Sequence, residues 1–367
     1  MHPRRSGLCS SHCLLVAGNL ILAACPQKDD ADSFGSPATE QAGARSSITL
    51  TEVVSLEVGT LLERAKAPNA PGQRGIDVAF LEGDTFVVLL EGSGPRYLAG
   101  GSEGATEVCM TARSLRTSGS TMAVGCGSFG QALPRVELYD GRLAKTRSID
   151  LPTTKTPASS TEMIWPVVAE DLKRAAVPGE TVDVYTLEDG TKQASCKLGT
   201  STSPVVDMVF SGAANLIAVG REDGTVELLD VTKPDAAPTV LAPEKPDQGP
   251  ALAFSSGGER LAVASFWGQF RLYARDGALV ASDAADEDHY GVHDVAFAPD
   301  GRIFQIQAGD LLVRDAKGKV VQTLAATDKV SPIFGTGAPV GLGAIAVSGE
   351  RLLALDADGQ RVVASKF

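Results

Sequence analysis

The sequence predicts an all-β fold, a seven-bladed β-propeller in which four-stranded antiparallel units close into a ring. The first observation is a repeat: the aligned residues Phe80, Phe210, Phe254 and Phe297 lie 130, 44 and 43 residues apart, and the first gap holds three periods. The second is that apolar and polar residues alternate with a period of two inside each unit. The third is the recurrence of Asp-Gly at turn positions, which suits two-residue hairpins. A period of this length with four strands is typical of propeller blades, which bury their faces only by stacking.

The composition of the 367-residue chain supports a folded domain and excludes one class of partner. Hydrophobic residues make up 43%, enough for a sizeable core, and the 39 glycines fit a chain with many tight turns. The net charge of -12 argues against nucleic acid, because binding to phosphates needs a basic surface.

Residues 1–24 are interpreted as a signal peptide and not as part of the fold. Arg4 and Arg5 precede a short apolar segment, CLLVAGNLILAA (13–24), which is too short to span a bilayer comfortably. It ends in Leu22-Ala23-Ala24-Cys25, which resembles the lipobox of bacterial lipoproteins. The resemblance implies that Cys25 becomes the first mature residue and carries lipid. The alternative is an ordinary secretory signal with a chance cysteine.

The residues after Cys25 are expected to form a tether. The residue that follows is Pro26 and not Asp, which in lipoproteins of Gram-negative bacteria implies transport to the outer membrane. Residues 25–46 are polar, rich in Gly, Ala and Ser and without periodicity, so we expect a lipidated cysteine and a flexible linker. The propeller domain is then 47–367.

The units follow one another along this domain. Four begin with the segments GIDVAF (75–80), VVDMVF (205–210), PALAF (250–254) and VHDVAF (292–297). Two less obvious units end in VELYDGRLAKTRSIDL (136–151) and TVDVYTLEDGTKQASCKL (181–198), and a last one fills 330–367. The segment 47–58 has the pattern of a strand, and the sequence allows two placements for it. It is the outer strand of the last blade, which requires VVASKF to lie inside it, or it packs outside a complete blade.

The unit VVDMVFSGAANLIAVGREDGTVELLDV (205–231) resembles a degenerate WD40 repeat. The usual Gly-His is absent, and Tyr139, Leu229 and Tyr273 replace the Trp of the Trp-Asp pair. A propeller of the YVTN or PQQ-like type is the alternative. The WD40 resemblance implies that the loops between second and third strands share one face with the loops between blades.

Mapping the units onto that face gives a candidate binding surface. Two large aromatic residues, Phe266 and Trp267, occupy a turn, where small polar residues are usual. The candidate binding residues are Phe266, Trp267, Asp288, His289 and Tyr290, with Phe129 from a loop of the second unit. They predict an aromatic centre with an acidic rim, suited to a protein partner or to a cationic or sugar ligand. Alternatively, Trp267 folds back onto a neighbouring blade and the acidic residues are merely solvated.

A second group, Asp77, Asp207 and Asp294, precedes the apolar parts of three innermost strands. These residues are expected to surround one mouth of the central channel, where a cation or a positively charged tip would dock. The alternative, which we favour, is that each carboxylate accepts hydrogen bonds from local backbone N–H groups.

Cys109, Cys126 and Cys196 remain after the signal and the lipidated cysteine. In an oxidising compartment, the strand positions predict a disulfide between Cys109 and Cys126. Cys196 lies within a strand and is expected to be a buried small hydrophobic residue.

No catalytic signature is visible: the one Gly-x-Ser-x-Gly match, GGSEG (100–104), is not the strand-to-helix turn of a nucleophile elbow, and the sequence contains neither His-Glu-x-x-His nor a phosphate-binding glycine loop. We therefore predict no catalytic residue, no metal site and no cofactor. The leading prediction is a lipid-anchored propeller at the outer membrane, exposed to the periplasm or the surface, that binds or assembles proteins of the cell envelope. The alternative is a hydrolase or lyase, similar to lactonases, with its site at the channel mouth. A purely structural surface protein is a third possibility.

Overall fold

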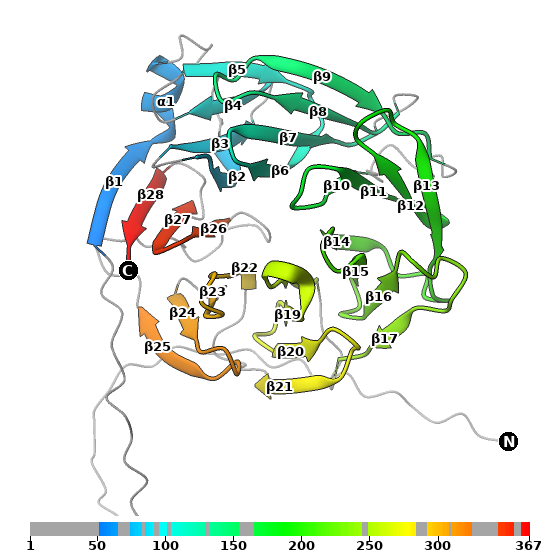
Figure 1. Ribbon diagram of the computed structural model, residues 1–367. Coiled ribbons are helices and arrows are strands. Elements are labelled where there is room, and N and C mark those ends of the chain that lie inside the picture. The colour runs from blue at the N-terminus through cyan, green and yellow to red at the C-terminus, as the bar shows by residue number, and fades with distance from the viewer. Residues whose placement is uncertain are drawn as a thin grey trace, which may run out of the picture. The chain divides into compact units, whose positions relative to one another are not determined.

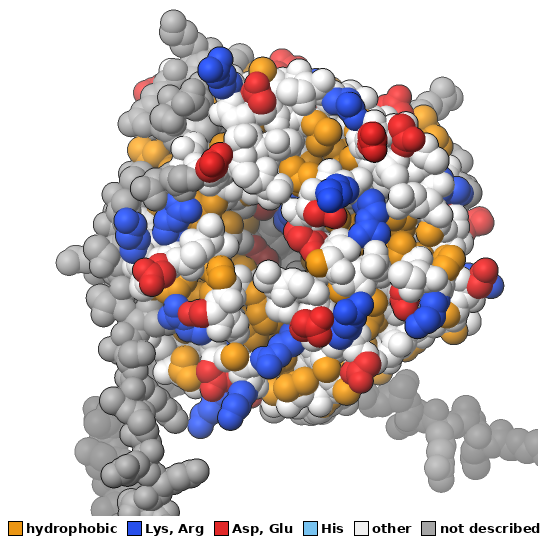
Figure 2. Space-filling model, viewed as in Figure 1, with side chains coloured by type: hydrophobic (Ala, Val, Ile, Leu, Met, Phe, Trp, Pro, Cys, Tyr) orange, Lys and Arg blue, Asp and Glu red, His pale blue; other side chains and the backbone are white. Residues whose placement is uncertain are grey.

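The computed structural model confirms an all-β propeller with seven four-stranded antiparallel blades. It describes residues 51–64, 74–82, 85–91, 95–100, 104–128, 133–153, 165–243, 249–283, 292–307, 310–324, 344–355 and 361–367. These belong to the compact unit Ser46–Phe367. Its blades stand around a central hollow, as Figures 1 and 2 show.

The first four blades follow the chain from residue 74. Blade 1 consists of β2 (Arg74–Phe80), β3 (Phe86–Glu91), β4 (Arg96–Gly100) and β5 (Gly104–Val108). Blade 2 consists of β6 (Ala112–Ser118), β7 (Thr121–Cys126), β8 (Arg135–Tyr139) and β9 (Lys145–Asp150). Blade 3 consists of β10 (Val167–Val168), β11 (Arg174–Pro178), β12 (Thr181–Thr186) and β13 (Lys192–Lys197). Blade 4 consists of β14 (Val205–Ser211), β15 (Leu216–Arg221), β16 (Val226–Asp230) and β17 (Thr239–Leu241).

The remaining blades complete the ring. Blade 5 consists of β18 (Ala251–Phe254), β19 (Arg260–Ala264), β20 (Phe270–Ala274) and β21 (Leu279–Asp283). Blade 6 consists of β22 (Val292–Phe297), β23 (Ile303–Gln307), β24 (Asp310–Arg314) and β25 (Val320–Leu324). Blade 7 consists of β26 (Ile345–Ser348), β27 (Arg351–Leu355), β28 (Arg361–Lys366) and β1 (Thr51–Glu57).

Blade 7 joins the two ends of the domain. β1 pairs antiparallel with β28, from Thr51 opposite Lys366 to Glu57 opposite Arg361 (Figure 1). The segment before the first blade is therefore the outer strand of the last blade, which is the first of the two positions that the sequence left open. VVASKF forms most of β28, inside β1.

Helices are few in the described residues. They are α1 (Val58–Arg64), which follows β1, and the 3₁₀ turn η1 (Ser256–Gly258). Neither is long and apolar enough to cross a membrane.

The hydrophobic core is divided among the junctions between blades. Seven clusters of buried side chains lie each between two neighbouring blades. Strand β3 shows why, because Val88 and Leu90 pack towards blade 7 while Val87 and Leu89 pack towards blade 2. Alternate residues of a strand point to opposite faces, so an inner blade strand that is buried on both sides is apolar throughout.

The Asp-Gly turns behave largely as predicted. In the β15–β16 turn, Gly224 has a φ of 80°, and the Asp223 carboxylate accepts the N–H of Thr225 at 3.0 Å. The Asp140-Gly141 turn differs, because there Leu143 has the positive φ, at 62°. The carboxylate of an aspartate accepts the backbone N–H two residues further on, which explains why Asp is repeated at these positions.

Candidate functional site

One face of the ring carries both groups of predicted site residues that the structure describes. The inner strand of a blade begins where the second strand ends, as the pairing of Val205 with Arg221 shows. The turns between second and third strands therefore lie on this side, which we call the turn face. Asp77, Asp207 and Asp294 lie near the starts of β2, β14 and β22, and so border the channel on the turn face.

The three aspartates bridge neighbouring blades. Asp77 accepts the N–H of Val78 at 2.8 Å with one oxygen and the N–H of Leu115, in blade 2, at 2.8 Å with the other. The equivalent donors to Asp207 are Met208 and Leu252, at 2.8 and 2.9 Å, and those to Asp294 are Val295 and Ile345, at 2.8 Å each. Each carboxylate thus ties the inner strand of its own blade to the inner strand of the next.

A bulge positions each of these carboxylates. The pairing between first and second strands skips one residue directly before Asp77, Asp207 and Asp294. An extra residue in one strand redirects the side chains next to it. The aspartate is thereby placed to reach across the junction between blades.

The surroundings favour the protonated forms of these carboxyls. Burial raises the pKa of Asp77 to about 6, although the charge of Arg116 and the two backbone hydrogen bonds lower it. Burial raises the pKa of Asp294 to about 7, with further contributions from the charges of Asp77 and Asp207. Burial likewise raises the pKa of Asp207. The charge of Asp207 also raises the pKa of Asp77, so the carboxyls interact across the channel, whose wall shows acidic side chains in Figure 2.

This geometry fits the interpretation in which the carboxylates accept backbone hydrogen bonds. One donor is local, as expected, but the other comes from the next blade, which the sequence did not indicate. A carboxylate has further lone pairs, so a proton or a cation in the channel still has a site to approach.

The aromatic pair lies at a turn tip of blade 5. In the β19–β20 turn, the N–H of Gly268 donates to the carbonyl of Ser265 at 2.9 Å. The rings of Phe266 and Trp267 meet edge to face with centroids 5.3 Å apart, and Trp267 keeps 39% of its surface exposed while Phe266 is half-buried. The turn therefore presents an ordered aromatic surface. Asp288, His289, Tyr290, Phe129 and the lipidation residue Cys25 lie outside the described residues.

Sequence reasoning missed a set of buried ionisable residues on the third strands. Glu137 accepts hydrogen bonds from Tyr139 at 2.6 Å and Lys145 at 3.0 Å, and an ion pair joins it to Arg135. Burial alone would raise the pKa of Glu137, but these hydrogen bonds and charges outweigh it and lower the pKa. The same strand position holds Asp183, Glu227 and Arg271 in the next three blades. The segments VELY, VDVY, VELL and FRLY contain this signal once they are aligned.

Two arginines beside the channel were also missed. Arg113 occupies the bulge of β6 and stacks over Trp165, 4.5 Å from the ring centroid. Arg116 in the same strand lowers the pKa values of Asp77 and Asp207 through its charge. A bulge has no clear sequence pattern, so neither the stacking of Arg113 on Trp165 nor the effect of Arg116 on the aspartates could be predicted from the residues alone.

The structure joins Cys109 and Cys126 by a disulfide, with Cα atoms 6.1 Å apart. Their sulfurs and a carboxylate oxygen of Glu137 lie within 4.8 Å of one another. The oxidised sulfurs are not thiolates, so this cluster is a covalent link between blades 1 and 2 with a buried carboxylate beside it. Cys196 is buried in β13, and burial raises the pKa of its thiol to about 11.

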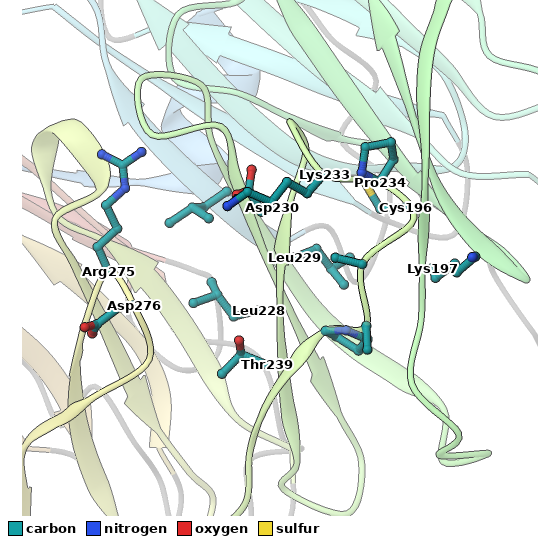
Figure 3. Close-up of a pocket in the computed structure, with 14 residues that line it drawn as sticks. Cys196, Lys197, Leu228, Leu229, Asp230, Lys233, Pro234, Thr239, Arg275 and Asp276 are labelled. Carbon is teal, nitrogen blue, oxygen red and sulfur yellow. The ribbon is translucent and has the colours of Figure 1, made fainter.

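A pocket of about 260 Å³ lies at the other end of the blades, around the end of β16. Figure 3 shows Arg275 and Asp276 on one side of it and Pro234 and Cys196 on the other, with Leu228 between. Its basic residues are already paired: Lys197 with Asp235, Lys233 with Asp230 and Arg275 with Glu259. No predicted site residue lines this pocket.

Comparison with known proteins supports the fold. No family model and no curated protein sequence matches the chain. A chain in the crystal structure of a mitotic checkpoint complex superposes with a TM-score of 0.59 at 14% sequence identity, covering 91% of this chain and 99% of that one. At this identity the likeness concerns the fold alone. Together with the seven closed blades, it shows that the chain is a seven-bladed β-propeller with a WD40-like fold.

Proposed function

We propose that this protein is a lipid-anchored β-propeller that binds a protein partner of the cell envelope on its turn face. The observation that carries the proposal is the exposed Trp267, held edge to face against Phe266 at a turn tip. Aromatic residues of this kind dominate the binding energy of protein interfaces. Ordering of the pair before binding reduces the entropy lost on association.

The fold agrees with such a role. Propellers commonly act as scaffolds for protein interactions, and the structural neighbour is a component of a protein complex. A rigid ring with variable turns on one face is suited to binding, because its blades position the turns while leaving their sequences free to vary.

A capture experiment tests this proposal. The purified protein and its Phe266→Ala/Trp267→Ala variant are immobilised, and each is exposed to envelope extract. We expect a partner that the native protein retains and the double variant loses. The matched control is Leu279→Ala/Val280→Ala, which removes exposed apolar residues from β21 on the outside of the same blade. Equal capture by all three proteins would contradict a role for the turn face.

The anchor is a separate part of the proposal and rests on Leu22-Ala23-Ala24-Cys25 alone. Its test is the Cys25→Ala variant expressed in a Gram-negative host. We expect the native protein to gain the mass of acyl chains and to sediment with membranes, and the variant to do neither. If both proteins sediment alike and neither is acylated, the lipoprotein interpretation is wrong.

The alternative is an enzyme of the hydrolase or lyase class at the channel mouth. Both oxygens of Asp77, Asp207 and Asp294 accept backbone N–H groups, which gives them a role in holding the blades together. We therefore place the enzyme second. Lactone hydrolysis by the native protein that disappears in Asp207→Asn, with folding intact, would reverse this order.

A further inference from the structure

The third strands of blades 2 to 5 share a buried ionisable position. Its occupants are Glu137, Asp183, Glu227 and Arg271, each only 1% exposed. The first three are acidic, and the fourth is basic. The position therefore reverses its charge in blade 5, the blade that carries Trp267.

Each of the three acids has a basic partner. Glu137 lies 3.0 Å from both Arg135 and Lys145, Asp183 lies 3.5 Å from Lys192, and Glu227 lies 2.8 Å from Arg221. A buried charge is tolerated in a fold when an opposite charge and hydrogen bonds compensate it. Blades 2 to 4 follow this rule.

Arg271 does not follow it within the described residues. Its guanidinium donates to the hydroxyl of Tyr273 and to the carbonyl of Gly224, each at 3.3 Å, and both acceptors are neutral. Its Nε has no hydrogen-bond partner, and no described carboxylate forms an ion pair with it. The guanidinium also lies 6.0 Å from the ring centroid of Tyr273. Buried charged groups in native proteins nearly always have a counter-charge, so Arg271 is suited to pair with an anion.

The location connects this arginine to the turn face. Gly224 belongs to the β15–β16 turn of blade 4, and Arg271 follows the turn that holds Phe266 and Trp267. The guanidinium thus lies at the junction of blades 4 and 5, below the turn face.

We propose that the junction of blades 4 and 5 is a carboxylate-binding site in which Arg271 pairs with an acidic side chain or a terminal carboxylate of a bound polypeptide. The proposal rests on the protein-binding function above and names the chemistry of the partner. A guanidinium offers planar, paired donors that match a carboxylate, and the aromatic pair on the turn that precedes its strand suits the apolar part of the same segment.

The test uses acetate as the probe and needs no partner. Thermal unfolding of the purified protein is followed in sodium acetate and in sodium chloride of equal ionic strength, about 200 mM, because a ligand that binds only the folded state raises the Tm. We expect acetate to raise the Tm of the native protein by about 2 °C. We expect no acetate effect in Arg271→Met, whose Tm in chloride is unchanged or higher because an unpaired buried charge has been removed.

Two controls make the result specific. Arg275→Met removes an exposed arginine of the same blade and should retain the acetate effect. Sodium phosphate replaces acetate in a further series, and a larger shift with phosphate would identify a phosphate site and overturn the carboxylate assignment. Equal Tm values of the native protein in acetate and chloride would overturn the proposal directly.

The competing occupant is a carboxylate of this chain, such as Glu244 or Asp247 in the segment before blade 5. If Glu244→Gln/Asp247→Asn lowers the Tm of the native protein but not that of Arg271→Met, the counter-ion is internal and the proposal is wrong. A negative acetate test would not contradict the proposed protein-binding function, which the capture experiment with the Phe266→Ala/Trp267→Ala variant tests separately. Once a partner is captured, Arg271→Met should weaken its binding at least about 10-fold.

Discussion

The carboxylate of Asp294 in blade 6 accepts the backbone N–H of Ile345 in blade 7 at 2.8 Å, so one side chain joins two neighbouring inner strands. Asp77 and Asp207 make the same connection from blade 1 to blade 2 and from blade 4 to blade 5. The ring is therefore held at these junctions by polar links on the channel side as well as by the hydrophobic clusters between the sheets.

Removal of one link should weaken the fold. Asp294→Ala leaves the N–H groups of Val295 and Ile345 without their acceptor, and we expect the free energy of unfolding to fall by about 1–3 kcal/mol. Urea denaturation measures the change. Asp235→Ala, whose side chain is exposed, is the control and should unfold like the native protein. If Asp294→Ala is as stable as this control, the carboxylate of Asp294 does not stabilise the junction between blades 6 and 7.

The same carboxyls predict an unusual dependence on pH. In the folded state the pKa of Asp77 is raised to about 6 and that of Asp294 to about 7, from 3.8. Between pH 3.8 and about 7 the folded protein therefore binds more protons at these two carboxyls than the unfolded chain does. The stability that their protonation contributes is present at low pH and is lost as the pH rises through about 6 to 7. We expect the free energy of unfolding to increase between about pH 8 and pH 5, in contrast to ordinary acid denaturation.

Urea titrations across this range measure the effect, with Asp77→Asn/Asp294→Asn as the comparison. The double variant should show a flatter curve, because its amides do not titrate. A native curve that falls steadily from pH 8 to pH 5, or a variant with the same slope as the native protein, would contradict the raised pKa values.

The buried ion pair in blade 4 should matter far more than an exposed one in blade 5. Arg221 and Glu227 lie 2.8 Å apart with side chains 5% and 1% exposed, whereas Arg275 and Glu259 are 50% and 70% exposed. Glu227→Gln leaves a buried arginine without its counter-ion, and we expect a loss of about 3–5 kcal/mol. Glu259→Gln should cost less than about 1 kcal/mol. Similar losses in the two variants, compared by denaturation, would refute this distinction.

The link between Cys109 and Cys126 predicts both a thiol count and a stability change. In a chain without Cys9, Cys13 and Cys25, denaturation without reductant should expose one reactive thiol, that of Cys196, and denaturation after reduction should expose three. Because the bond closes a loop with a sequence separation of 17, Cys109→Ala/Cys126→Ala should lower the free energy of unfolding by about 3 kcal/mol. Three reactive thiols before reduction would rule the bond out.

The blades were predictable because their signals are local. Alternation along a strand and an aspartate that binds the N–H two residues on, as Asp223 does with Thr225, involve only neighbouring residues. The outer position of β1 was not predictable, because its strand pattern is the same in either arrangement. Only the pairing of Thr51 with Lys366, which the fold brings together, distinguishes them.

The candidate site was predictable in part for the same reason. Trp267 stands out at a turn, so its position on the turn face follows from the repeat alone. The reach of Asp207 to Leu252 depends on a bulge before it, and the isolation of Arg271 depends on what faces it in blade 4. Such features are contacts between segments that are distant in the sequence, and the residue pattern of one segment does not show which residues of another segment it contacts.

The closure of blade 7 has a consequence for how the molecule is made. β1 is synthesised before every other strand of the domain, yet its partner β28 is the last to appear, with Thr51 and Lys366 separated by 315 residues. Until the final strand emerges, β1 has no edge on which to pair and blade 1 has no blade 7 against which to bury Val88 and Leu90. Ring formation is thus a late, long-range event, so we expect the nascent chain to expose apolar surface until its last strand is made.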